Sequence, residues 1–208
     1  MKRFFIFNRQ KGTTLIELVV VLAIFITVIS TAITLFLAIV SQQSKVLAEQ
    51  DFLNEISYMT DYISRAVRTA QKDTTGSCTG ISGADYVLTH YNATVNVASS
   101  QGAYMGIKFL SINNVCTEFY ADNTNPASWI INEVKAGGTP QNILSTKYTV
   151  VSFYFFLNGD KTISVASEND TVQPRVSFGS RISLKTLGNT AKNRYFSTTI
   201  SQRNLNIK

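Results

Sequence analysis

The feature that most constrains this chain is an uncharged apolar run near its N-terminus. Leu18–Val40 holds no charged residue, no proline and no glycine. As a helix, this run would extend roughly 35 Å at about 1.5 Å per residue, which is enough to cross the hydrocarbon core of a bilayer. A helix also lets a hydroxyl group bond back to its own backbone. The sequence therefore predicts one membrane-spanning helix that tolerates its four central hydroxyl residues, Thr27, Ser30, Thr31 and Thr34.

Basic residues precede the run and predict its orientation. The 208-residue chain carries 19 basic and 13 acidic residues, a formal charge of +6. Four of the basic residues lie at the very start: Lys2, Arg3, Arg9 and Lys11. By the positive-inside rule, we expect the N-terminus in the cytoplasm and the rest of the chain outside. Because this short segment supplies most of the net charge, the total does not by itself indicate a nucleic acid partner.

Two ordinary N-terminal signals compete as explanations of the run. A secretory signal peptide would have a shorter apolar stretch followed by a small-residue cleavage site, and Ala38–Val40 is a poor version of such a site. An uncleaved signal anchor explains the span and the orientation. Neither explains Glu17, because a carboxylate at the edge of a membrane helix is costly unless it is paired or neutralised.

The residues around Glu17 match a known family. Lys11–Glu17 reads Lys-Gly-Thr-Thr-Leu-Ile-Glu and leads into the apolar run. This pattern resembles the leader of type IV pilins and type II secretion pseudopilins. The resemblance implies that residues 1–12 are a leader, which a prepilin peptidase removes by cutting between Gly12 and Thr13. It also implies N-methylation of Thr13 and a role for Glu17 in subunit assembly.

The chemistry of these positions agrees with that resemblance. Gly12 leaves room for the backbone to enter a protease cleft, because glycine has no Cβ. The α-amine freed at Thr13 would pair with Glu17 of a neighbouring subunit and fix an assembly register. The alternative for Glu17 is a carboxylate favoured by the positive end of the helix dipole. The chain departs from the family in having Thr13 where a large apolar residue is usual. It also lacks a helix proline, which favours a minor subunit.

The helix is expected to continue beyond the membrane. Six apolar residues recur at helical spacing on one stripe: Phe52, Ile56, Met59, Ile63, Val67 and Ala70. Such a stripe is typical of a helix face that packs on a core. We therefore expect a membrane and assembly helix over 13–45, its amphipathic continuation over 46–72, and an extracytoplasmic head over 73–208.

The head is predicted to be rich in β-strands. Strand-like segments are Tyr104–Ser111, Val115–Tyr120, Trp129–Val134, Tyr148–Leu157, Thr162–Ala166, Arg175–Lys185 and Tyr195–Gln202. Tyr148–Leu157 is apolar on both faces, which suits a central position, and Asn158-Gly159 is a hairpin signal. Residues 84–103 are expected to be irregular or a short hairpin. The predicted fold class is α+β and pilin-like, with a long N-terminal helix, half of it transmembrane, packed on a mainly antiparallel sheet.

Cys78 and Cys116 would both lie outside the cytoplasm, where an oxidising compartment favours a disulfide. The closed loop would contribute roughly 3 to 4 kcal/mol in the chain-entropy model. Two separate buried thiols are the alternative.

No constellation typical of an enzyme is evident, and we expect neither catalytic residues nor a cofactor. His90 has no nucleophile or metal partner nearby in sequence, so a surface or hydrogen-bonded structural role is favoured. Four residues around a predicted turn offer oxygen ligands: Asp160, Glu168, Asn169 and Asp170. They lack the spacing of a calcium loop, and we expect a solvated turn and no metal.

Charge divides unevenly along the chain. Residues 13–170 hold 8 basic and 13 acidic residues, whereas residues 171–208 hold 7 basic and none acidic. Arg175, Arg181 and Lys185 share strand parity, which would place them on one sheet face. A solvated face, or pairing with the head's own acids, is the ordinary interpretation. The sharper hypothesis is docking to an acidic surface of a neighbouring subunit, with DNA as the second candidate.

The closing segment, residues 195–204, resembles the last strand of J-type minor pseudopilins and related minor pilins. Together these features predict a minor pilin or pseudopilin subunit, without enzymatic activity, in the bacterial inner membrane and in a pilus or pseudopilus after assembly. Its expected partners are the prepilin peptidase and other pilin-like subunits. A signal-anchored extracytoplasmic binding module and a DNA-binding competence pilin remain the alternatives.

Overall fold

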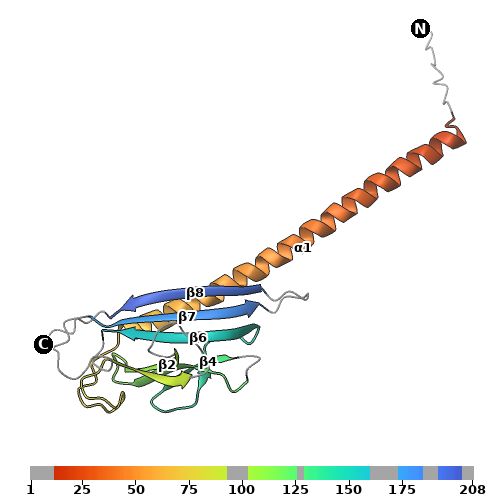
Figure 1. The fold of residues 1–208 in the computed structure, drawn as a ribbon. Helices are drawn as coiled ribbons and strands as arrows, with labels where there is room; N and C mark the ends of the chain where they lie inside the picture. The colour runs from red at the N-terminus through yellow and green to blue at the C-terminus, as the bar shows by residue number, and fades with distance from the viewer. Residues whose placement is uncertain (1–11, 93–102, 126–128, 160–172, 185–191, 203–208) are drawn as a thin grey trace, which may run out of the picture. The chain divides into compact units, whose positions relative to one another are not determined.

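The computed structural model describes residues 12–92, 103–125, 129–159, 173–184 and 192–202 (Figure 1). Within them the chain forms one helix, α1 (Leu15–Arg68), and eight strands. The strands are β1 (Tyr86–Asn92), β2 (Ala103–Leu110), β3 (Cys116–Asp122), β4 (Ile130–Lys135), β5 (Gln141–Asn142), β6 (Tyr148–Asn158), β7 (Arg175–Leu184) and β8 (Lys192–Ser201). The expected α+β class is confirmed. The chain divides into two compact units, Met1–Asp51 and Phe52–Lys208.

The first unit contains the beginning of α1. No proline or glycine interrupts it from Leu15 onward, although its many valine, isoleucine and threonine residues have only moderate helix propensity. Every side chain from Gly12 to Leu47 is exposed. The hydroxyl residues bond back to the helix as expected, for example Thr27 Oγ1 to the carbonyl oxygen of Ile24 at 2.7 Å. This half of α1 therefore has no core of its own.

The second unit contains the rest of α1 and the sheet, which share one core. The predicted stripe is confirmed, because all six of its residues are buried: Phe52, Ile56, Met59, Ile63, Val67 and Ala70. They belong to one apolar cluster with sheet residues such as Ile107, Phe119 and Phe155. Complete burial of side chains of this size contributes on the order of 2 kcal/mol each.

The sheet is antiparallel throughout, with strand order β5-β4-β3-β2-β6-β7-β8, and β1 pairs with β2. β6 is an interior strand between β2 and β7, as expected for Tyr148–Leu157. Among the described residues, its pairing with β2 is limited to Tyr104 and Phe155. β6, β7 and β8 are long strands, and β7 pairs with both of the others along most of its length (Figure 1). The predicted strand at Thr162–Ala166 lies outside the described residues.

Three predictions about helices and strands differ from the structure. The helix ends at Arg68 and not near Lys72, because the backbone N–H of Gln71 donates to Leu110 O at 2.8 Å and draws the chain toward the sheet. Residues 86–92 form the regular strand β1, where irregular structure or a short hairpin was expected. The two-residue strand β5 was not predicted.

The residue that follows β8 contacts the earliest segments of the head. Gln202 is buried, and its Nε2 donates to Ala70 O and to Asp85 Oδ1, both at 3.0 Å. These partners lie just after α1 and just before β1. One amide therefore links the last described strand to the first two elements of the head.

Candidate functional site

The segment that carries the processing motif leads directly into α1. Gly12, Thr13 and Thr14 are exposed and without regular structure. The carbonyl oxygen of Thr14 accepts backbone hydrogen bonds from Glu17 at 3.1 Å and from Leu18 at 3.2 Å. Thr14 therefore caps the helix, and Gly12 and Thr13 precede it in exposed, non-helical chain.

Glu17 occupies the third position of the first helical turn. A threonine cap followed three residues later by glutamate is the capping-box pattern. A carboxylate at this position is also stabilised by the positive end of the helix dipole. Among the described residues, no ion pair involves Glu17. The structure thus places Glu17 where a local helix-capping role is available, while its role in assembly stays a prediction.

Apolar side chains are exposed on both sides of Glu17. Leu15 is 83% exposed and Ile16 is 73% exposed, and large apolar side chains stay exposed along the run. Among the described residues, α1 is the one helix long and apolar enough to cross a membrane. Such a surface is compatible with lipid or with other apolar helices, and not with water.

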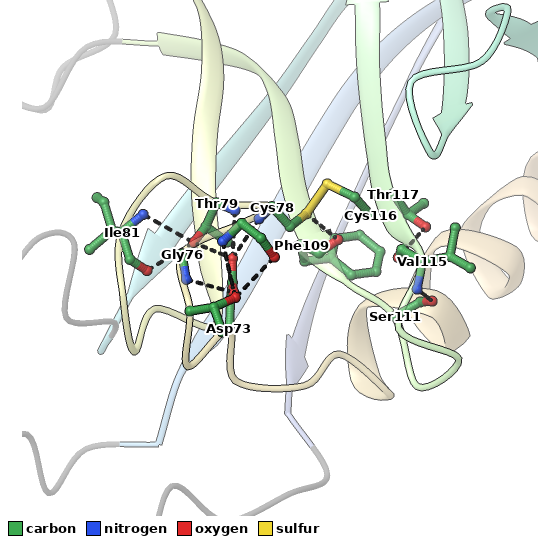
Figure 2. The surroundings of a disulfide bond; sticks show 12 residues. Asp73, Gly76, Cys78, Thr79, Ile81, Phe109, Ser111, Val115, Cys116 and Thr117 are labelled. Atoms are coloured by element: carbon green, nitrogen blue, oxygen red, sulfur yellow. Dashed lines mark hydrogen bonds between the residues drawn. A yellow bond between two sulfur atoms is a disulfide. The ribbon is translucent and has the colours of Figure 1, made fainter.

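The disulfide between Cys78 and Cys116 is confirmed. The two Cα atoms are 5.3 Å apart, and the residues are separated by 38 in sequence number. Cys78 lies in the loop between α1 and β1, whereas Cys116 is the first residue of β3 (Figure 2). The bridge therefore ties the loop that follows the helix to the middle of the sheet.

Asp73 organises the same loop, and the sequence-based prediction missed it. Figure 2 shows its carboxylate beneath the backbone of the following residues. It accepts hydrogen bonds from the backbone N–H groups of Gly76, Ser77, Cys78 and Thr79 and from the hydroxyls of Thr75 and Thr79, at 2.8 to 3.2 Å. Burial opposes ionisation, but the hydrogen bonds from Thr79 and Cys78 outweigh it, and the pKa of Asp73 lies far below its ordinary value. An aspartate followed by Gly, Ser and Thr is the local signal for such a turn.

A groove of about 520 Å³ lies in the second unit between α1 and strands β2 to β4. Tyr62 donates to Glu133 at 2.9 Å, and Lys135 Nζ lies 3.0 Å from both Glu133 Oε2 and the Tyr62 hydroxyl. Burial raises the pKa of the Tyr62 phenol, while the hydrogen bond from Lys135 acts in the opposite direction. These three polar groups provide hydrogen-bond partners for one another, which favours a structural role for all three.

His90 lies beside an acidic and an aromatic side chain, and its surface or structural role stays a prediction. Its Nε2 lies 3.2 Å from Glu118 Oε1, and its ring stacks on Tyr120 with centroids 4.3 Å apart. The backbone φ of His90 is +54°, and its ring lies beside Gly106, where a Cβ would come within 2.9 Å of His90 Cδ2. The glycine therefore makes the space for the histidine on this face.

The predicted basic face is present in part. Arg175 and Arg181 share one face of β7, opposite the buried side chains of Val176, Phe178 and Ile182. Lys185 lies outside the described residues, as do the four residues of the predicted solvated turn. Within the described ranges, no group of three or more His, Cys, Asp or Glu side chains is arranged to hold a metal ion.

The predicted residues form separate sites. Gly12, Thr13 and Glu17 lie at the start of the first unit, and the disulfide and the arginines belong to the second. No family model, no curated protein and no solved structure matches the chain.

Proposed function

We propose that this chain is a subunit of a type IV pilus or a type II secretion pseudopilus, built by packing of its apolar helix against those of other subunits. A prepilin peptidase removes residues 1–12 and Thr13 becomes the methylated N-terminus. The N-terminus lies in the cytoplasm before assembly, and the head lies outside the bacterial inner membrane.

One observation carries this proposal. The helix that begins three residues after Gly12 is apolar and exposed as far as Leu47, and its first turn holds a single carboxylate, Glu17. A helix anchored only in lipid has no need of that carboxylate. A helix that packs among copies and relatives can pair it with the α-amine of a neighbour, which would specify the register.

We further propose a minor subunit near the tip of the fibre. The helix contains no proline, and the head holds a sheet of eight strands. In this proposal the helix supplies assembly and the head supplies the choice of partner. The chain acts as a substrate of the peptidase and has no enzymatic activity of its own.

Co-expression with a prepilin peptidase tests the processing step. We expect N-terminal sequencing to find Thr13 first, and mass spectrometry to find that residue methylated. A chain that keeps Met1 would contradict the proposal and support a signal-anchored binding module.

Gly12→Val is a matched control for this experiment. A Cβ at Gly12 would meet nothing within 4 Å, so the substitution leaves the fold of the chain undisturbed. Loss of cleavage in this variant, with the head still folded, would assign the effect to the fit of Gly12 in the peptidase cleft. Cleavage at an unchanged rate would show that the cut does not depend on this motif.

A further inference from the structure

The outer face of β6, β7 and β8 combines arginine with aromatic and hydroxyl side chains. The register places Arg181 between Ser152 and Tyr195, and the next row holds Tyr154, opposite Gly179. We call this surface the Arg181 face; its members are Ser152, Tyr154, Ser177, Arg181, Tyr195 and Ser197. None of these residues is acidic.

Arg181 is held in place without a counter-ion. Its side chain is half-buried, and its Nε is a buried donor with no hydrogen-bond partner. Among the described residues, no salt bridge involves it. Because the residue as a whole is only half-buried, part of it remains open to an acceptor from a partner.

Two tyrosines, Tyr154 and Tyr195, lie near the arginine. Burial raises the pKa of Tyr154, and the positive charge of Arg181 acts against that rise, as expected for close neighbours. The ring of Trp129 packs edge-on against Tyr154 at 6.1 Å. Tyr195 is 74% exposed beside the arginine. Arginine, tyrosine and tryptophan are the residue types that dominate binding energy at protein interfaces.

The charge on this face suits a polypeptide better than a nucleic acid. Its strand β7 carries two described cations, Arg175 and Arg181, which are roughly 20 Å apart at about 3.3 Å per residue. Nucleic acid binding depends on neutralising several phosphates. A carboxylate needs only one guanidinium, whose two Nη groups can donate to its two oxygens.

We infer that the Arg181 face binds an acidic segment of a partner polypeptide, with a carboxylate on Arg181 and apolar atoms against Tyr154 and Tyr195. This binding goes beyond the proposed assembly function and does not depend on it. The surface lies wholly in the second unit, so cleavage at Gly12 and packing of the helix can fail while the binding persists.

The test uses the full chain in nanodiscs of zwitterionic lipid and fluorescence anisotropy. The probe is a labelled peptide of alternating glutamate and serine, as long as β8, and the reference is its glutamine–serine counterpart. We expect the acidic peptide to bind more tightly, and salt to weaken its binding. Arg181→Gln should lower the affinity at least about tenfold, and Arg181→Lys less, because an ammonium group cannot form the two-pronged contact.

Lys108→Gln is the matched control, since it removes the same charge from β2, outside the Arg181 face. It should leave the affinity unchanged. Tyr195→Ala removes an exposed ring that the core does not need, and should weaken binding about fivefold. Equal binding of the two peptides, no measurable binding, or equal loss in the Lys108 and Arg181 variants would overturn the inference. Tighter binding of a single-stranded thymidine oligonucleotide of equal charge would assign the face to nucleic acid instead.

Discussion

The first and second halves of α1 differ in where their apolar side chains find partners. From Gly12 to Leu47 every side chain is exposed, and apolar residues occur on all sides. From Phe52 to Arg68 the buried residues form a single stripe that shares a core with the sheet. A helix that is apolar all round needs an environment that the chain does not provide, whereas an amphipathic helix finds it in its own head.

The largest expected effect comes from placing one charge in each half. Ile63→Asp puts a carboxylate at a site with 0% exposure, and should destabilise the head by more than about 5 kcal/mol. Ile29→Asp should leave the head intact and disfavour membrane insertion by about 3 kcal/mol. Denaturant unfolding followed by the fluorescence of the single tryptophan measures the first effect, and extraction from membranes measures the second. Equal loss of head stability in both variants would contradict the division.

A smaller effect is expected where the helix enters the head. Asp73→Asn replaces a charged acceptor by an amide oxygen, and should lower the free energy of unfolding by about 1 to 3 kcal/mol. The folded pKa of Asp73 is depressed, so its stabilisation is complete above the ordinary aspartate pKa near 4 and is lost as the pH falls below it. Unfolding curves between neutral and acid pH should show this loss in the wild-type chain and a weaker loss in the variant. An identical pH profile in both would remove Asp73 from this role.

The smallest effect on the head is expected from Glu17→Gln, which removes the charge but keeps the capping box, because glutamine also serves at that position. Head stability and cleavage at Gly12 should stay unchanged, while incorporation into fibres falls. Glu17→Ala, which removes both the charge and the capping-box partner of Thr14, provides the comparison. Normal incorporation of the glutamine variant would leave Glu17 with a capping role alone.

Local patterns predicted much of this fold. The stripe from Phe52 to Ala70 follows from helical spacing, and its burial is confirmed. β1 was missed because its side chains alternate only weakly, with buried Tyr86 followed by residues that are half-buried or exposed. The contact of Tyr62 with Glu133 joins residues 71 positions apart, so no local pattern reveals it. The Gly, Ser and Thr residues after Asp73 signal a loop that ends the helix, but they do not reveal that one carboxylate accepts hydrogen bonds from its backbone N–H groups.

The contacts of Gln202 bear on the order in which the head forms. Its amide reaches Ala70 and Asp85, 132 and 117 positions earlier in the chain. Contacts of such separation form late, because a long loop must close first. A chain synthesised from its N-terminus delivers the helix and β1 well before Gln202. The head can therefore reach its final packing only after β8 is in place, and a truncation before β8 would leave the region around Asp85 open.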